Sequence, residues 1–497
     1  MTNKKEKLNK NYEKLPINTK FFKDLELEII GLFDNLDEAL DGRLIKSDNF
    51  QALNTLLPKY KGQVQTVYID PPFNLGENAS YDYLVNYRDS TWATILENRL
   101  DFAKSILEQK GCIFARCDYN GNFILRMVLD RIFDNLNFRN EIATGRTIQG
   151  ALNSQFEKMT TMNTGYDNIY WYSVNSENKF KNFIKAAGKQ GNSYWHGFHK
   201  LSDRKNLRYE LFGIKPQKGQ WLWREDRACL AVKNYEEFLE YNNKSGLNLE
   251  NYWTETGCSK EFLRHKDSSK SNNSVEYWIC PREVVLLNTN WTDISGYSSR
   301  HGFQTENSEP LLYRIINNSS NIHDLVLDFF LGSGTTTAVA HKLNRRWLGI
   351  EIGEQYYDHC LPRMKQVLAY DSGGISNQIK EYKGGGFFKY YELEQYEDAL
   401  KMAVYNPTKN ELENIDFSLS EKQAKVGLDI DLKKEKAKFV FEKLYSDVDI
   451  PETISNLFGK KIKKITKDKV VFEDESEVDL NNLDFNKYES LKKLIYW

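Results

Sequence analysis

The tetrapeptide Asp70-Pro71-Pro72-Phe73 combines groups that can hold and activate an exocyclic amine. Prolines donate no backbone hydrogen bond and have a fixed φ, so the Pro71 carbonyl is held outward beside the Asp70 carboxylate. Two acceptors that bind both N–H groups favour a pyramidal nitrogen, which frees its lone pair for attack. Phe73 can stack on a base, a contact that contributes about 1–3 kcal/mol. By itself, the tetrapeptide fits equally well a strand that ends in a turn capped by prolines.

A second chemical signal is the glycine-rich segment LDFFLGSGTTTA (327–338), which lies between an expected strand and an expected helix. Glycines at such a turn let the backbone approach a ligand, and the helix N-terminus offers free amide groups. Glu351 ends the next expected strand, 17 residues after Gly334. A carboxylate at that position can accept hydrogen bonds from two ribose hydroxyls.

Three kinds of ligand could bind at this turn: a nucleotide phosphate, a dinucleotide and S-adenosylmethionine. A phosphate-binding loop needs a lysine at its end, and the turn has none, which argues against an ATPase. A dinucleotide fold expects a third glycine where this chain has Thr337. S-adenosylmethionine (AdoMet) has a ribose but no phosphate, and its cationic sulfonium and amino groups suit acidic neighbours such as Asp328 and Glu351. A tight turn that binds nothing remains the alternative.

The elements that must position these residues alternate between strand and helix. Apolar and β-branched runs predict strands at 42–48, 64–70, 111–118, 166–174, 323–330 and 347–352, and helical spacing predicts helices at 49–60, 91–109, 122–133 and 335–346. Such alternation indicates an α/β fold with a parallel sheet, whose ligands bind at the carboxyl ends of the strands. Both chemical signals follow a strand, so we expect them at one edge of the sheet.

The alternation is interrupted from about residue 176 to 295 by a polar stretch that is rich in aromatic residues. An insertion of about 120 residues therefore splits the α/β domain. We expect an N-terminal arm (1–40), two parts of the core (41–177 and 296–370) around an inserted domain (178–295), and a linker with a C-terminal domain (371–497). The C-terminal domain contains a predicted hairpin, KKITKDKVVFEDESEVDL.

Composition narrows the class of protein. Of the 497 residues, 40% are hydrophobic, which is enough for a core, and the formal net charge is −2, which argues against a globally basic DNA-binding chain. The window 179–227, however, holds twelve basic and only four acidic residues. No apolar run approaches the ~20 residues of a membrane span. The basic N-terminus lacks the apolar stretch of a secretory signal, and six scattered cysteines indicate reduced thiols in a cytosol-like compartment.

Together, DPPF and FFLGSGTT resemble the amino-group DNA methyltransferases that use AdoMet. The order of the two motifs, with a long insertion between them, is similar to that of the β-class adenine-N6 enzymes and especially of the modification (Mod) subunits of type III restriction–modification systems. The resemblance spans about residues 40–400 and includes LIKSDNFQAL, YDNIYWYS and LGIEIGE. It implies a seven-stranded, Rossmann-like sheet that is split by a target-recognition domain, with a smaller C-terminal domain.

The resemblance also assigns roles to individual residues. It implies catalysis and the holding of a flipped adenine by Asp70, Pro71, Pro72 and Phe73. It implies contacts with AdoMet by Asp328, Phe330, Gly332, Ser333, Gly334, Thr335 and Thr305, with Glu351 on the ribose and with Asp48 and Asn49 near the adenine of the cofactor. Asn74 and Asp118 are expected to line the substrate pocket, although Asp118 fits a helix cap equally well.

One segment departs from the family pattern. Relatives often read T-E-K-P-E before the strand that leads to the AdoMet turn, whereas this chain reads Thr305-Glu306-Asn307-Ser308-Glu309. The Lys-Pro pair is missing, so no lysine can contact the cofactor there. Thr305 is retained.

By family position, the inserted domain recognises the target sequence. Its basic residues, among them Arg204, Arg208, Lys218 and Arg224, would neutralise phosphates while a few side chains read base edges. A solvated charged face around a small aromatic core is the alternative. The resemblance implies duplex DNA as partner and raises two protein partners, a second copy of the chain and a restriction (Res) subunit. It implies a bacterial, cytoplasmic, DNA-associated protein that uses no metal.

The expected function is transfer of a methyl group from AdoMet to N6 of an adenine flipped out of duplex DNA, by direct in-line attack. The acidic opening of DPPF favours adenine, because cytosine-N4 enzymes more often open with serine. Cytosine-C5 enzymes need a Pro-Cys pair, and Cys280-Pro281 has the reverse order. The alternatives are a DNA-binding specificity subunit with idle catalysis, a cytosine-N4 DNA methyltransferase, and an RNA or protein methyltransferase.

Overall fold

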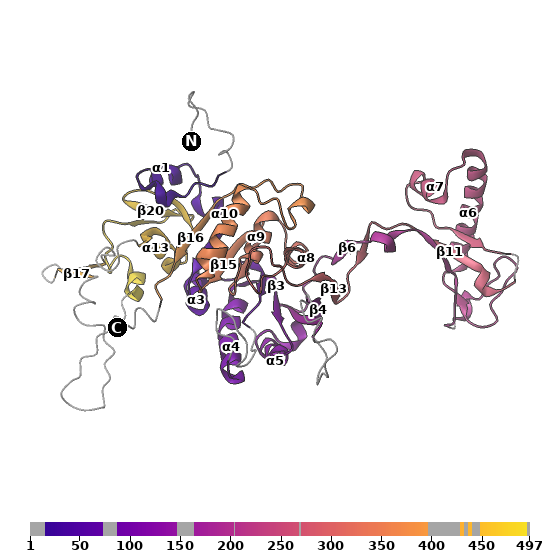
Figure 1. The fold of residues 1–497 in the computed structure, drawn as a ribbon, viewed down its shortest axis with the longest axis horizontal. Helices are drawn as coiled ribbons and strands as arrows, with labels where there is room; N and C mark the ends of the chain where they lie inside the picture. The colour runs from indigo at the N-terminus through magenta and orange to yellow at the C-terminus, as the bar shows by residue number, and fades with distance from the viewer. Residues whose placement is uncertain are drawn as a thin grey trace, which may run out of the picture. The chain divides into compact units, whose positions relative to one another are not determined.

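A computed structural model (Figure 1) describes residues 15–72, 87–146, 164–202, 204–267, 270–395, 428–431, 436–439 and 448–494. The chain divides into two compact units. One consists of Met1–Lys181 with Asn288–Trp497, and the other of Asn182–Leu287. None of the helices in the described ranges combines the length and the apolar character that crossing a membrane requires.

Within the described residues, the larger unit is built on a nine-stranded sheet in the order β13-β4-β5-β3-β2-β14-β15-β1-β16. Only β5 runs antiparallel to its neighbours; the remaining pairs are parallel. The strands are β1 (Gly42–Lys46), β2 (Val64–Ile69), β3 (Leu107–Cys117), β4 (Phe138–Gly145), β5 (Tyr166–Ser173), β13 (Asn290–Ser295), β14 (Leu325–Asp328), β15 (Arg346–Glu351) and β16 (Phe388–Glu392). This sheet confirms the predicted α/β, Rossmann-like class.

Seven of these strands, from β4 to β1 in the sheet order, form the expected core, and two more extend its edges. Strand β13 pairs with β4 although its residues fall in the predicted inserted domain, and β16 pairs with β1 although its residues fall beyond the predicted core. Strand β4 was not predicted from the sequence either. Edge strands are half-exposed and lack a continuous apolar run, so periodicity alone identifies them poorly.

The side chains of β2 alternate between two layers of helices. Val67 and Ile69 belong to a core built with α3 (Asn49–Tyr60), α4 (Asp89–Ile106) and α5 (Asn122–Phe133). Thr66 and Tyr68 point to the other face, where the Thr66 hydroxyl donates to Ser319 at the end of α8 (Glu309–Ser319). Helices α9 (Thr335–Lys342) and α10 (Leu361–Ala369) accompany α8 in Figure 1, and a π-helical turn, Tyr356–Cys360, leads into α10.

Helix α4 ends three residues earlier than the predicted 91–109. Leu107 pairs with Val64 of β2, so β3 begins where the helical periodicity still continues. The predicted helix 335–346 is shorter for a similar reason, because Arg346 already pairs with Leu325 of β14. In both places, pairing in the sheet outweighs the local helical pattern.

The N-terminal arm and the C-terminal segment pack together in one small module. It contains α1 (Glu26–Gly31), α2 (Leu36–Ala39), α13 (Ile450–Phe458), β19 (Ile462–Ile465), β20 (Lys469–Phe472) and β21 (Glu477–Asp479). Leu36 of the arm shares a hydrophobic core with Ile454 and Ile462. The predicted hairpin is confirmed by the antiparallel pairing of β19, β20 and β21. A separate antiparallel pair is formed by β17 (Leu428–Asp431) and β18 (Lys436–Phe439).

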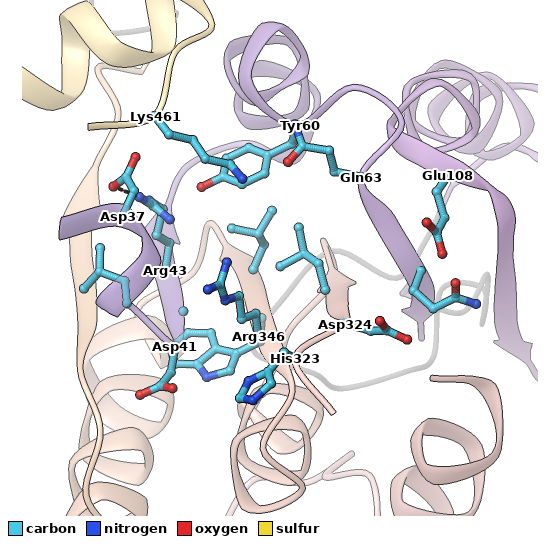
Figure 2. A pocket seen from close by; sticks show the side chains of 16 residues that line it. Asp37, Asp41, Arg43, Tyr60, Gln63, Glu108, His323, Asp324, Arg346 and Lys461 are labelled. Atoms are coloured by element: carbon cyan, nitrogen blue, oxygen red, sulfur yellow. Dashed lines mark hydrogen bonds and ion pairs between the residues drawn. The ribbon is translucent and has the colours of Figure 1, made fainter. Parts of the chain in front are cut away.

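A buried ion cluster joins this module to the sheet. We call it the docking cluster; it consists of Asp37, Arg43, Lys59, Lys389 and Glu452. The Lys59 ammonium lies 2.9 Å from an oxygen of Asp37 and 3.2 Å from Glu452, and Lys389 lies 3.0 Å from Glu452. Arg43 pairs with Asp37 (Figure 2). Burial alone would raise the pKa of Glu452, but Lys389, Lys59 and Arg43 hold it well below its ordinary value.

A cavity of about 190 Å³ lies beside the docking cluster, among the amino ends of β1, β2, β14 and β15 (Figure 2). Its walls mix cations with carboxylates, among them Arg346, Lys461, Glu108 and Asp324. Open α/β sheets bind ligands at the carboxyl ends of their strands, and such mixed charge selects no ligand class. A functional site is therefore expected at the opposite edge of the sheet.

The smaller unit is built around aromatic side chains. Its elements are β6 (Ile184–Ala186), β7 (Tyr194–Gly197), β8 (His199–Lys200), β9 (Gln220–Trp221), α6 (Glu225–Ser245), α7 (Leu249–Glu255), β10 (Leu263–His265), β11 (Val275–Ile279) and β12 (Val284–Leu286). Trp221 is fully buried with Phe198, and its indole nitrogen donates to the Tyr209 carbonyl at 2.9 Å. Arg264 stacks on Trp195 at 4.0 Å. Much of the aromatic content of this region therefore builds its core.

Candidate active site

Carboxylates gather at the carboxyl ends of neighbouring parallel strands. Asp70 follows β2, Asp328 ends β14 and Glu351 ends β15, and these three strands are adjacent in the sheet. Asp118 follows β3 on the other side of β2. Because the ends of parallel strands meet at one edge, residues up to 281 positions apart in the sequence come together there.

The glycine-rich turn after β14 has the backbone geometry that the sequence predicted. Gly332 and Gly334 have φ of 57° and 80°, in the left-handed region that favours glycine. The Gly332 amide donates to an oxygen of Glu351 at 2.7 Å. A Cβ at Gly334 would lie 3.4 Å from the Cα of Cys360, an ordinary van der Waals contact, so the conformation rather than the space favours glycine there. The turn is thereby fixed against the end of β15.

Glu351 and Asp328 are buried and accept hydrogen bonds without an ion pair in the described part of the chain. One oxygen of Glu351 accepts from the amides of Ile352 and Gly353 and from the side chain of Gln355, at 2.8–3.0 Å. Asp328 accepts from the Phe330 amide at 2.9 Å and from the Thr336 hydroxyl. Burial raises the pKa of Asp328 to about 7 and also raises the pKa of Glu351.

Asp70 has one engaged and one free carboxylate oxygen. Its Oδ2 accepts from the Asn307 amide at 2.8 Å and lies 3.9 Å from the Arg116 guanidinium. Its Oδ1 is buried and has no hydrogen-bond partner in the described part of the chain. Burial raises the pKa of Asp70 to about 6, although Arg116 and Asn307 act in the opposite direction. A buried acceptor without a donor is costly and indicates a ligand group that donates.

The two prolines are positioned by a buried tryptophan. The Trp92 indole nitrogen, from the first turns of α4, donates to the Pro72 carbonyl at 2.9 Å. Trp92 is almost fully buried in the core beneath this edge of the sheet. The start of the tetrapeptide is thus fixed by the core. Phe73 and Asn74 lie outside the described residues.

Asp48 and Asn49 hold the end of β1 to its neighbours. Asp48 caps α3 by accepting from the amides of Phe50 and Gln51, and its other oxygen lies 3.0 Å from Arg99. Asn49 donates to the Phe329 carbonyl at 2.8 Å, directly after β14. These contacts keep both residues beside the strand that carries Asp328. Their predicted contact with the cofactor adenine stays a prediction.

The remaining predicted residues lie at the same edge. Thr335 begins α9; its hydroxyl donates to the Asn307 carbonyl and lies 3.2 Å from the Ser333 hydroxyl. Phe330 packs against the core. Asp118 accepts from the amide and side chain of Asn120, as in the turn-capping alternative, and its charge still helps to raise the pKa of Asp70. Thr305 is half-buried, two residues before Asn307.

A second set of residues at this edge was not predicted. Arg116 is fully buried and donates to Asn307 at 2.6 Å, to Asp167 at 2.7 Å and to the Gly296 carbonyl at 2.9 Å. It also lies 4.0 Å over the ring of Tyr297. An arginine within the apolar strand GCIFARCD was a usable signal, because buried arginines need partners.

The four predicted DNA-contacting residues all lie in the smaller unit. Arg204, Lys218 and Arg224 are exposed, and Arg224 immediately precedes α6. The guanidinium of Arg208 donates to the carbonyls of Gly219 and Gln217, at 2.8 and 3.2 Å. Arg208 therefore supports the local fold, whereas the other three lie exposed at the surface of this unit. Their roles stay predictions.

The donor set at this edge suits AdoMet. Burial raises the pKa values of three carboxylates, Asp70, Asp328 and Glu351, and the charges of Asp70 and Glu351 raise the pKa of Asp328 further. Among the described residues, the one cation within ion-pair distance of these carboxylates is Arg116, 3.9 Å from Asp70. A ligand with cationic groups would complete this balance, whereas a phosphate would add to the negative charge. Glu351, fixed beside the glycine turn, has the position expected of a ribose acceptor.

Comparison with known proteins agrees with this geometry. The family model described as DNA methylase (N6_N4_Mtase) matches residues 64–361, and the chain belongs to this family. A probable type III restriction–modification enzyme HindVI Mod subunit of Haemophilus influenzae is 29% identical over 418 residues, which cover 73% of this chain and 55% of that protein. The predicted resemblance to the Mod subunits is thereby confirmed.

Two further relatives are of different types. The type II methyltransferase M.EcaI of Enterobacter cloacae is 26% identical over 328 residues, 63% of this chain and 67% of that protein. The EcoPI Mod subunit of Escherichia phage P1 is 21% identical over 363 residues, 61% of this chain and 55% of that protein. The chain thus spans about half the length of the type III relatives it matches.

Proposed function

We propose that this protein transfers a methyl group from AdoMet to N6 of adenine in duplex DNA. The observation that carries the proposal is the buried Oδ1 of Asp70, which has no hydrogen-bond partner among the described residues, at the same sheet edge as the Gly332–Gly334 turn and Glu351. The free oxygen can accept an N–H group of the target amine. The carboxylates beside it suit the cationic methyl donor, and membership of the DNA methylase family supports this assignment.

AdoMet would be held by Glu351 at its ribose and by Asp328 and the Gly332–Gly334 turn near its charged groups. When bound, it supplies a methyl group made electrophilic by the sulfonium. Glu351 is already oriented for this task by the amides of Gly332 and Gly353. Such preorganised acceptors need no rearrangement when the ligand enters.

Asp70 orients the attacking nitrogen. Oδ1 accepts one N–H group, and the Pro71 carbonyl is the second acceptor, so the lone pair of N6 is freed from the base. With a pKa of about 6, Asp70 is mostly ionised near pH 7.5 and can accept hydrogen bonds. The proton that leaves N6 after transfer passes to Asp70 or to solvent. An adenine inside a duplex must first be flipped out of the stack.

The smaller unit, residues 182–287, is proposed as the target-recognition domain. Its exposed cations Arg204, Lys218 and Arg224 would contact phosphates. The similarity to Mod subunits supports a role as the modification component of a restriction–modification system, with a Res subunit and a second copy of the chain as proposed partners. The DNA substrate, in turn, supports a cytoplasmic location.

The test is methylation of unmodified DNA with tritiated AdoMet, followed by separation of the nucleosides. The wild type is expected to produce N6-methyladenine, and Asp70→Asn to lose at least about 100-fold of the rate, since it exchanges the free acceptor for an amide. Asp101→Asn, on the exposed side of α4, is the matched control. Equal incorporation by wild type and Asp70→Asn would refute the proposal. N4-methylcytosine as product would assign the enzyme to cytosine instead.

A further inference from the structure

Asn307 connects the parts of the candidate active site. Its side-chain nitrogen donates to Oδ2 of Asp70 at 2.8 Å. Its side-chain oxygen accepts from Arg116 at 2.6 Å and from the Tyr68 hydroxyl at 2.8 Å. Its backbone carbonyl accepts from Thr335 at the start of α9. One residue thus contacts the ends or interiors of β2, β3 and α9.

The orientation of the Asn307 amide is decided by its neighbours. Arginine carries only donors, so the amide oxygen must face Arg116 and the amide nitrogen must face Asp70. The position of the whole residue is also fixed, because the next residue, Ser308, caps α8 by accepting from the Leu311 amide. Glu306, on its other side, pairs with Arg363 at 3.1 Å. Asn307 therefore lies between two anchored residues.

Arg116 could in principle satisfy Asp70 directly, but both of its terminal nitrogens donate elsewhere, and its Nε has no hydrogen-bond partner in the described residues. It binds Asp167, the Gly296 carbonyl and Asn307, and stays 3.9 Å from Asp70. A bidentate arginine pair would occupy both carboxylate oxygens. With Asn307 between them, Oδ2 of Asp70 is engaged, and Oδ1, without a partner in the part of the chain that the structure describes, can accept from a ligand.

We propose that Asn307 is a positioning residue for Asp70: it engages Oδ2 alone, and so keeps Oδ1 directed at the target amine. This inference rests on the proposed function. The segment that departs from the family pattern in sequence thereby has a definite task in this chain, because an amide offers a donor to Asp70 and an acceptor to Arg116 at the same time.

The protonation of Asp70 gives this role a measurable signature. The Asn307 hydrogen bond lowers the pKa of Asp70 against the effect of burial. The titratable and charged groups that act on Asp70 come from all the elements around it: Arg116, Asp118, Asp167, Asp328, Tyr68 and Tyr297. A substitution at Asn307 replaces none of these groups but changes its own contacts with Asp70, Arg116 and Tyr68, so a change in the acid limb of the pH profile reports on the hydrogen bonds that Asn307 forms around Asp70.

The test compares pH profiles of kcat/KM for methyl transfer between pH 5 and 9. Asn307→Asp keeps an acceptor for Arg116 and Tyr68 but places a carboxylate against Asp70. Its acid limb is expected to move to higher pH by about one unit or more, with kcat affected more than the KM for AdoMet. Asn307→Leu, which adds no charge but removes both the donor to Asp70 and the acceptor for Arg116 and Tyr68, is expected to give a smaller shift in the same direction.

Asn318→Asp is the matched control, because it adds the same charge at the far end of α8, where Asn318 donates to the Arg314 carbonyl. Its acid limb should match the wild type. Acid limbs of Asn307→Asp and Asn307→Leu that coincide with the wild type would overturn the inference and leave the proposed function standing. If Asn307→Asp shows no cooperative unfolding and is therefore not folded, the acid limb of Asn307→Leu alone tests the inference. A wild type without methyl transfer would refute the proposed function, and the inference with it.

Discussion

Two groups of buried charges in the larger unit differ in how far cations offset their carboxylates. The docking cluster sets three cations, Arg43, Lys59 and Lys389, against Asp37 and Glu452, with Asp449 at 2.6 Å from Lys389 as a third carboxylate, and the pKa of Glu452 is held low. The site carboxylates Asp70, Asp328 and Glu351 have raised pKa values instead, because burial there is not offset by enough positive charge.

The difference separates a structural role from a functional one. A buried charge cluster that is balanced needs nothing further and holds two parts of the protein together. A cluster with excess charge of one sign destabilises the fold unless a ligand of the opposite sign completes it, and such perturbed groups are typical of functional sites. The same substitution, acid to amide, should therefore have opposite effects in the two places.

The largest effect is expected from Glu452→Gln. It leaves Arg43 and Lys59 buried with Asp37 as their remaining carboxylate, while Lys389 keeps Asp449 at 2.6 Å, and should lower the free energy of unfolding by about 3–5 kcal/mol. Urea unfolding followed by tryptophan fluorescence measures the change. An unaltered transition would show that the docking cluster contributes nothing to stability.

Asp328→Asn should act in the opposite direction. The folded-state pKa of Asp328, about 7, exceeds its ordinary value of 3.8, so the folded protein binds the proton more tightly. Its ionisation costs stability as pH rises from about 4 to 7, by about 1.4 kcal/mol for each unit of pKa difference. The asparagine variant should be relatively more stable above pH 7 than at pH 4.5. Thermal unfolding across this range, with identical differences at both ends, would contradict the expectation.

The same variant should bind AdoMet more weakly. Loss of a buried carboxylate beside a cationic ligand costs about 1.5–3 kcal/mol, or roughly 10-fold to 150-fold in Kd. Isothermal titration of the free protein measures this without any methyl transfer. Glu452→Gln, in contrast, should leave the Kd for AdoMet unchanged under conditions in which the variant is folded. A similar loss of AdoMet binding in Glu452→Gln would show that the docking cluster and the candidate site are coupled.

The smallest effect is expected at the surface of the C-terminal module. Lys463 pairs with Glu475, whose side chain is 69% exposed, so Lys463→Ala should change the free energy of unfolding by less than about 1 kcal/mol. The measurement is the same urea titration as for Glu452→Gln. A loss as large as that of the buried cluster would show that burial does not distinguish the two kinds of ion pair.

Much of the candidate site could be predicted, because its residues sit in short motifs next to strands. Asp70, Gly332, Gly334 and Glu351 follow β-branched runs, and the rule that ligands bind at carboxyl ends of parallel strands places them together. The contacts of Asp48 and Asn49 with the cofactor stay a prediction, since both side chains also bind neighbouring residues of the protein.

The residues that were missed act across long separations in the sequence. Asn307 meets Asp70 over 237 positions, and Arg116 meets Asn307 over 191. Arg116 belongs to no motif, and Asn307 lies where this chain departs from T-E-K-P-E, so no local pattern names the partners of either residue. The edge strands β13 and β16 were not predicted for the same reason, since their pairing with β4 and β1 defines them, rather than their own composition.

The amino-acid sequence alone determined the class of sheet, the order of the two motifs and the chemistry of the groups that follow its strands, because each depends on neighbours within a few residues. The tertiary structure decided which carboxylates lack a cation, which oxygen of Asp70 stays free and which residue holds it. Those properties depend on burial and on distances between segments, and both exist only once the chain has folded.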